Sequence, residues 1–118
     1  MKIKVNPLDS AFSKYVRLLA DDKCEYCGEA STQVHHFHGR RKLSTRYDRD
    51  NVCSICFVCH QGFHEHPNIA TDFFKKRLGS ERYEQLNIRS QMIKKMSKQD
   101  KKDLMIFYKE QIKLAIKM

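Results

Sequence analysis

Two Cys-x-x-Cys pairs, far apart in the sequence, constrain the fold of this chain more than any other feature. Cys24 pairs with Cys27, and Cys56 pairs with Cys59. Four thiolates match the ligand type and number of a closed tetrahedral zinc site, and two distant pairs that share one ion staple their segments together. The sequence therefore predicts a structural Zn²⁺ bound by these four cysteines. The alternative is a set of unpaired buried cysteines.

The chain has five cysteines, so one is left over. Cys53 and Cys56 also have the spacing of a pair, which leaves a second frame open. The frame with Cys56 and Cys59 is preferred, because it places Cys53 inside an apolar strand, where a free cysteine behaves as a small hydrophobic residue. In a reducing cytosol, metal binding is also favoured over disulfides. We expect Cys53 to lie in the core.

A length of 118 residues suits a single domain, residues 1–118. Apolar spacing predicts a helix over residues 8–21, capped by Asp9 or Ser10. Short strands are expected over residues 33–38 and 51–55, with a loop between them and a helix after the second cysteine pair. The fold class is therefore α+β, with a helix before a small zinc-bound core.

Residues 68–118 are expected to form a basic helical extension of that core. Helices are predicted over residues 69–78, ending at Gly79 as a C-cap, and over 80–95. A motif that resembles a capping box, Ser97-Lys98-Gln99-Asp100, predicts the start of the last helix. The residues expected to face inward are Tyr83, Leu86, Ile88, Met92, Leu104, Phe107, Tyr108, Ile112 and Ile116.

The chain is strongly basic, with a net charge of +9 and a pI near 9.4, which is typical of proteins that bind nucleic acid. Residues 75–118 alone contain 13 lysines and arginines against 5 acidic residues. Such helices suit phosphates, although solvated helix faces or a protein partner are alternatives. No run of about 18 apolar residues and no secretory signal is visible, so we expect a cytoplasmic protein without a membrane partner.

A second group of residues follows the pattern His-His-x14-Asn-x8-His-x3-His, formed by His35, His36, Asn51, His60 and His64. His60 and His64 are four residues apart, so both imidazoles can approach one ion from one helical face. In a strand, His35 and His36 point to opposite sides. One of them can therefore bind metal while the other does separate chemistry.

This spacing resembles that of the HNH endonucleases, and of the nuclease colicins in particular. Their ββα-metal unit consists of two short strands and a helix around one catalytic divalent ion. The four cysteines, with Cys59 directly before His60, are similar to the zinc-stapled branch of the family, whose core is treble-clef-like. The resemblance implies an HNH core over residues 24–66.

A wider set of matches extends over residues 8–90. It comprises Leu8-Asp9-Ser10-Ala11-Phe12-Ser13, His38-Gly39-Arg40-Arg41, Thr45-Arg46-Tyr47-Asp48, Asp50-Asn51, Cys59-His60, and Gly79 followed by Tyr83 and Leu86. These residues resemble the NinG recombination-protein family of lambdoid phages. That resemblance implies a phage or prophage protein in a bacterial cytoplasm, acting on branched or recombining DNA, with phage recombination or packaging proteins as possible partners.

The HNH resemblance also implies roles for individual residues. His35, His60 and His64 would bind the catalytic ion, which is Mg²⁺, Mn²⁺, Ni²⁺ or Zn²⁺. His36 would be the general base, and Asn51 would hold the His36 imidazole in its working orientation. A neutral imidazole, with a pKa of about 6.5, suits proton transfer at neutral pH. The alternative for Asn51 is a local turn cap.

Three arginines, Arg40, Arg41 and Arg46, lie between the expected strands and are candidates for DNA binding, because a guanidinium can meet two phosphate oxygens. The alternative is a solvated loop. His38 and His66 are expected to be surface residues.

The leading hypothesis is a metal-dependent HNH endonuclease that hydrolyses DNA phosphodiester bonds. The first alternative is a non-catalytic zinc-stapled module that binds nucleic acid, for which the cysteines and basic residues suffice. The second is an interaction protein that uses its C-terminal helices. The oligomeric state is left open.

Overall fold

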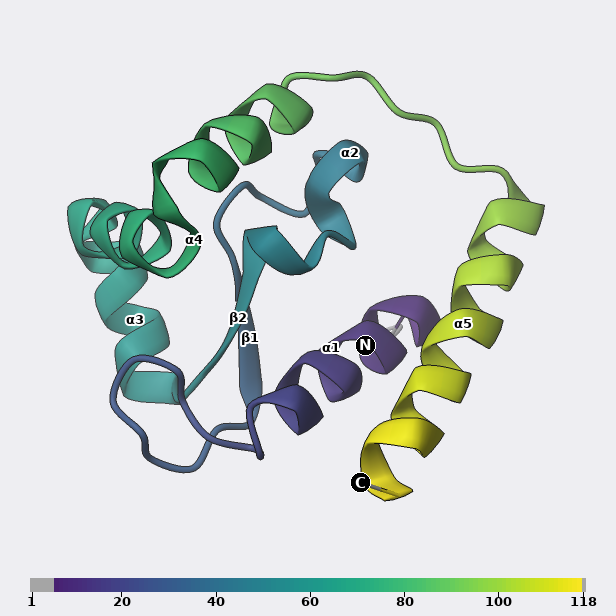
Figure 1. Ribbon diagram of the computed structural model, residues 1–118, viewed down its shortest axis with the longest axis horizontal. Helices are drawn as coiled ribbons and strands as arrows, with labels where there is room; N and C mark the ends of the chain where they lie inside the picture. Colours follow the sequence, from purple (N-terminus) through teal and green to yellow (C-terminus); the bar gives the residue numbers. More distant parts are fainter. Residues whose placement is uncertain (1–5, 118) are drawn as a thin grey trace, which may run out of the picture.

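The structure is a computed structural model that describes residues 6–117 (Figure 1). It has an α+β fold, as the sequence predicts. The elements in chain order are α1 (Pro7–Leu19), β1 (Gln33–His36), α2 (Leu43–Arg46), the 3₁₀ helix η1 (Arg49–Asn51), β2 (Val52–Ile55), α3 (Phe57–Glu65), α4 (Pro67–Ser90) and α5 (Lys98–Lys117).

The two strands form a small antiparallel sheet at the centre of the molecule. His35 lies opposite Cys53, and His36 lies opposite Val52. Figure 1 shows α3 and α4 on one side of the strands and α1 and α5 on the other. Because side chains alternate along a strand, neighbouring residues face different helices.

Each side of the sheet has its own apolar cluster. Toward α3 and α4, Cys53 and Ile55 pack with Phe63 and Phe74. Toward α1 and α5, Val52 packs with helix residues that include Phe12, Val16 and Tyr108. All four residues of β2 are buried, so both faces of this strand contribute to the core.

Helix α1 begins earlier than its apolar pattern indicates. Its N-cap is Asn6, whose Oδ1 accepts a hydrogen bond of 2.9 Å from the backbone N–H of Leu8, and Pro7 occupies the first turn. The expected caps, Asp9 and Ser10, therefore lie inside the helix. The side chain of Asp9 is left free for contacts elsewhere in the molecule.

The segment between the strands is more structured than the predicted loop. Strand β1 ends at His36, and the chain then forms α2 and η1 before β2. Asp48 caps η1, because its side chain accepts from the backbone N–H of Asp50 at 3.0 Å. We refer to residues 37–51 as the connecting loop.

Helix α4 joins the two helices expected on either side of Gly79, where it is sharply kinked. It ends at Ser90, five residues earlier than predicted. The capping box at the start of α5 is present, with reciprocal 3.0 Å hydrogen bonds between Ser97 and Asp100. None of the helices in residues 6–117 is long and apolar enough to cross a membrane.

The inward positions of the extension are only partly as predicted. Leu86 and Tyr108 are buried, and Tyr83, Leu104 and Ile112 pack against the two clusters. Helix α5 packs on the domain with one face, so the residues off that face are exposed. In the last turns of α4, Leu86 and Ser90 are buried and Ile88 is exposed, and Met92 follows the end of the helix. The residues predicted inward but found exposed are Ile88, Met92, Phe107 and Ile116.

The kink predicts a specific sensitivity to substitution. Gly79 has φ 79° and ψ 162°, a conformation that is essentially restricted to glycine. Gly79→Ala should lower the free energy of unfolding by about 1–3 kcal/mol. No atom lies within 4 Å of the added Cβ, so the cause is backbone strain alone. Urea denaturation of the zinc-loaded protein measures the change.

Gly62→Ala is the matched control, because Gly62 lies within α3 and also has space for a Cβ. This substitution should raise the free energy of unfolding by about 0.5–1 kcal/mol. Equal effects at the two glycines would contradict the role given to the Gly79 backbone.

Candidate functional site

The four cysteines of the two pairs lie together, as the sequence predicts. Cys24 and Cys27 follow α1, whereas Cys56 and Cys59 lie at the start of α3, and their four sulfur atoms are within 4.8 Å of one another. The Cys27 and Cys56 Sγ atoms are 3.7 Å apart. With Zn–S bonds of about 2.3 Å, tetrahedral ligands are separated by about 3.8 Å. The cluster could therefore bind a structural Zn²⁺.

The local backbone also suits thiolate ligands. The N–H groups of Cys27 and Cys59 point at the sulfurs of Cys24 and Cys56, each at 3.5 Å. Burial disfavours the Cys24 thiolate, but backbone N–H donors lower its pKa to about 7. Burial and the neighbouring thiols raise the pKa of Cys59. Four thiolates this close need a cation to offset their charges.

The fifth cysteine is separate from this cluster. Cys53 is 1% exposed and packs in the apolar cluster toward α3 and α4. Burial raises the pKa of its thiol to about 12, so it stays protonated. Its place in the core agrees with the frame in which Cys56 pairs with Cys59.

Three of the five residues in the His-Asn-His pattern form a second cluster. His35 comes from β1, and His60 and His64 come from α3, with one ligand atom of each ring within 4.8 Å of the others. The rings of His60 and His64 are 4.8 Å apart between centroids, as expected for residues one helical turn apart. Three imidazoles in this arrangement can bind one divalent cation.

A glutamine outside the His-Asn-His pattern orients one of these rings. Gln33 Oε1 lies 2.7 Å from His60 Nδ1. An amide oxygen can only accept, so Nδ1 carries the proton and Nε2 is free to bind a cation. Gln33 could have been identified from the strand period of two, which places it on the same side of β1 as His35.

His35 is the buried member of the cluster, with 6% of its surface exposed. Burial, together with the charges of His60 and His64, lowers its pKa to about 3. The ring is therefore neutral at pH 7, as a metal ligand must be. Its Nδ1 is buried with no hydrogen-bond partner among residues 6–117, so one ring nitrogen has a free position for a cation.

His36 faces the other side of the sheet, toward Phe12 of α1. Its Nε2 is 3.0 Å from the backbone carbonyl oxygen of Arg46, at the end of α2. Because a carbonyl can only accept, Nε2 carries the proton and Nδ1 keeps the basic lone pair. Burial lowers the pKa of His36 to about 4, so the ring is neutral at pH 7.

Asn51 is fully buried, but within the described chain its amide forms hydrogen bonds with the connecting loop and none with the His36 ring. Its Oδ1 accepts from the backbone N–H of His38 at 2.8 Å. Its Nδ2 donates to the carbonyl oxygens of His38 and Thr45 at 2.9 and 3.0 Å. Asn51 thus fixes the loop that carries Arg46, and the Arg46 carbonyl in turn orients His36.

Asp9 fixes the same loop from α1. Its carboxylate accepts two hydrogen bonds from Arg46, at 3.0 and 2.5 Å, and one from the Tyr47 hydroxyl at 2.8 Å. Burial opposes ionisation of Asp9, but these donors and the charge of Arg40 lower its pKa. No sequence signal indicated this contact, because Asp9 and Arg46 are 37 positions apart.

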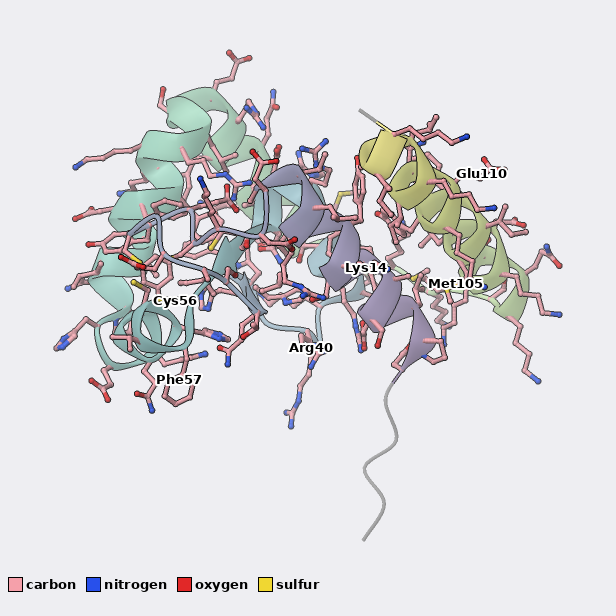
Figure 2. All side chains as sticks on the ribbon, turned by 90° about the horizontal axis from the view of Figure 1, so that it is seen from below. Lys14, Arg40, Cys56, Phe57, Met105 and Glu110 are labelled. Carbon is pink, nitrogen blue, oxygen red and sulfur yellow. The ribbon has the colours of Figure 1, made fainter. Side chains whose placement is uncertain are left out.

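The three candidate DNA-binding arginines lie in different surroundings. The Arg46 guanidinium is held on Asp9, whereas Arg40 approaches Asp9 at 3.2 Å and keeps 59% of its side chain exposed. Arg41 is exposed. Arg40 projects away from the body of the protein in Figure 2. Arg40 and Arg41 are therefore accessible to a ligand, and Arg46 is mainly structural.

Helix α4 holds the far side of the connecting loop. His38 is half-buried rather than fully at the surface, and its Nε2 lies 2.8 Å from Asn87 Oδ1. Arg89 donates to Asp48 at 2.8 Å and to Asp50 at 3.3 Å. By contrast, His66 is exposed, as predicted, at the junction of α3 and α4.

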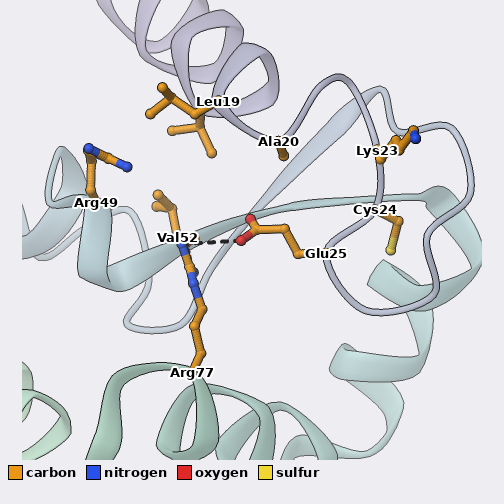
Figure 3. A pocket seen from close by; sticks show the side chains of 9 residues that line it. Leu19, Ala20, Lys23, Cys24, Glu25, Arg49, Val52 and Arg77 are labelled. Carbon is orange, nitrogen blue, oxygen red and sulfur yellow. Dashed lines mark hydrogen bonds and ion pairs between the residues drawn. The ribbon is translucent and has the colours of Figure 1, made fainter.

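One cavity of about 560 Å³ connects the histidine cluster with His36. Its lining includes the four histidines of the pattern, together with Asp9, Arg40 and Arg41. A smaller cavity, of about 210 Å³, lies between the end of α1 and Cys24 (Figure 3). Arg77 there pairs with Glu25 at 3.3 Å. The larger cavity joins three potential metal ligands to a neutral imidazole and is the candidate active site.

Comparison with models of protein families, with curated proteins and with solved structures found no match to this chain.

The connecting loop predicts a large effect of one buried amide. Asn51→Ala removes three hydrogen bonds and leaves buried backbone groups unpaired, so it should lower the free energy of unfolding by about 2–4 kcal/mol. Asn87→Ala removes one half-buried contact and should cost about 1 kcal/mol. Chemical denaturation of both variants tests this. Equal, small losses would mean that the Asn51 amide does not hold the loop.

Proposed function

We propose that this protein is a metal-dependent endonuclease of the HNH type that hydrolyses phosphodiester bonds of DNA. The observation that carries the proposal is the single cavity lined by three clustered imidazoles and by His36. Strand β1 supplies His35 and His36, and α3 supplies His60 and His64, with β2 between them in the chain; this is the element order of the unit that the sequence resembles.

His36 is the general base in this proposal. Its Nδ1 accepts a proton from the attacking water, while Nε2 stays bonded to the Arg46 carbonyl. Arg40 and Arg41 bind the phosphate and offset its charge. The cation bound by the three other histidines would polarise the phosphate and stabilise the leaving oxygen.

The ligand set favours some cations over others. Three imidazoles suit Mn²⁺, Ni²⁺ or Zn²⁺ better than Mg²⁺, which prefers oxygen ligands. Gln33 supports metal binding at this cluster, because it leaves Nε2 of His60 free for an ion. The structural Zn²⁺ at the four cysteines holds α3, and so its two histidines, against the segment after α1.

The proposed substrate is branched or recombining DNA. This proposal is based on the resemblance of residues 8–90 to phage recombination proteins. The proposed protein partners are, on the same basis, phage recombination or packaging proteins. The basic extension supports a DNA substrate, with 13 lysines and arginines in residues 75–118. A zinc-stapled module that only binds nucleic acid is the alternative. It would need neither the histidine cluster nor a bonded, neutral His36.

The test is cleavage of supercoiled plasmid and of a four-way DNA junction by the purified protein with EDTA, Mg²⁺, Mn²⁺ or Ni²⁺. Loss of the general base in His36→Ala should reduce metal-dependent cleavage by about 10²–10⁴-fold, while the protein still folds and binds zinc.

His66→Ala is the matched control, because His66 is exposed outside the cavity, and it should cleave like the wild type. Undiminished cleavage by His36→Ala would remove His36 as the base. Binding without cleavage, with every metal and both DNAs, would favour the non-catalytic module.

A further inference from the structure

Phe57, the first residue of α3, belongs to neither apolar cluster of the described residues. It is 58% exposed. Each of the other six phenylalanines contacts another aromatic ring, but Phe57 contacts none within residues 6–117. The next residue, Val58, is 74% exposed. The start of α3 thus presents apolar surface to the solvent.

Helix geometry places this ring beside the histidine cluster. Phe57 precedes His60 by three residues and His64 by seven. At about 100° per residue, its Cβ points within about 60° of that of His60 and about 20° of that of His64. It lies about 4.5 Å along the helix axis from His60. The ring therefore shares the helix face that carries two of the proposed metal ligands.

Two arginines line the cavity that contains His60 and His64. Figure 2 shows Phe57 and Arg40 projecting from the same side of the protein. Arg40 and Arg41 line the histidine cavity, and the chain carries a net charge of +9. An exposed aromatic ring on the helix face of a cavity that contains guanidinium groups matches a nucleobase and its phosphates more closely than it matches an apolar protein surface.

We propose that Phe57 stacks on an unpaired base next to the scissile phosphate, so that the site selects DNA with unstacked bases over intact duplex. The inference rests on the proposed function and assigns one residue to the recognition of junctions, splayed arms and single-stranded segments. In a duplex, both faces of each base are covered by its neighbours, so a side chain outside the helix cannot stack on them. At a branch point, an unpaired base can turn outward at little cost.

The test measures binding without cleavage. His36→Ala protein loaded with zinc is titrated into a splayed-arm DNA and a duplex of equal length, each with 2-aminopurine at the same position, next to the branch in the splayed DNA. Fluorescence anisotropy gives the Kd, and quenching of 2-aminopurine reports stacking. Adding Phe57→Ala should raise the Kd for the splayed DNA about tenfold and abolish quenching. The Kd for the duplex should change less than twofold.

Two further variants separate stacking from other causes. Phe57→Tyr keeps an aromatic ring and should keep the preference for splayed DNA. Phe107→Ala removes a phenylalanine of similar exposure on α5, on the opposite side of the molecule from α3, and should change neither Kd.

Equal weakening on both DNAs would overturn the proposal, because it would make Phe57 a general contact. Unchanged affinity for both would also overturn it and would point to a protein partner for the ring. Failure of the wild type to cleave would refute the nuclease assignment, but it would leave this binding result interpretable.

Discussion

The antiparallel pairing of β1 with β2 determines which side of the sheet His35 and His36 face. Because His35 is opposite Cys53 and His36 is opposite Val52, the first histidine faces α3 and the second faces α1. A shift of one residue would exchange these directions and separate His35 from His60 and His64. Burial of all four β2 residues opposes such a shift. Ser31, just before β1, also bonds the backbone of Ile55 at 2.8 Å.

The connecting loop is the second element on which the site depends. Its Arg46 has two roles, since its guanidinium pairs with Asp9 and its backbone carbonyl orients His36. Asn51 fixes the loop from within, and Arg89 of α4 fixes its acidic residues from outside. The His36 ring is therefore positioned by α1 and by the connecting loop, which α4 holds in turn. A rigid frame of this kind keeps one nitrogen of His36 protonated and the other basic.

Much of this arrangement could be predicted from the sequence, because local spacing determines it. The Cys-x-x-Cys pairs indicated the cluster of four cysteines, and the i, i+4 histidines with strand alternation indicated the cluster of His35, His60 and His64. The contacts that could not be predicted from the sequence join residues far apart in the chain, or they involve a side chain that has several common roles in proteins. The position of Asp9 before an apolar helical pattern predicts a helix cap, but Asn6 performs that role. Gln33 could have been identified from its strand face, but the Arg89 ion pairs had no local signal.

The central claim is that the two clusters form two metal sites of different chemistry, one made by the four cysteines and the other by the three histidines. The most direct measurement is titration of the metal-free protein with Co²⁺, followed by optical absorption. The account predicts two bound equivalents, one with thiolate-to-cobalt charge-transfer bands and one without. His60→Ala should keep the thiolate bands and lose the second equivalent. A single equivalent in the wild type, or two in His60→Ala, would contradict the account.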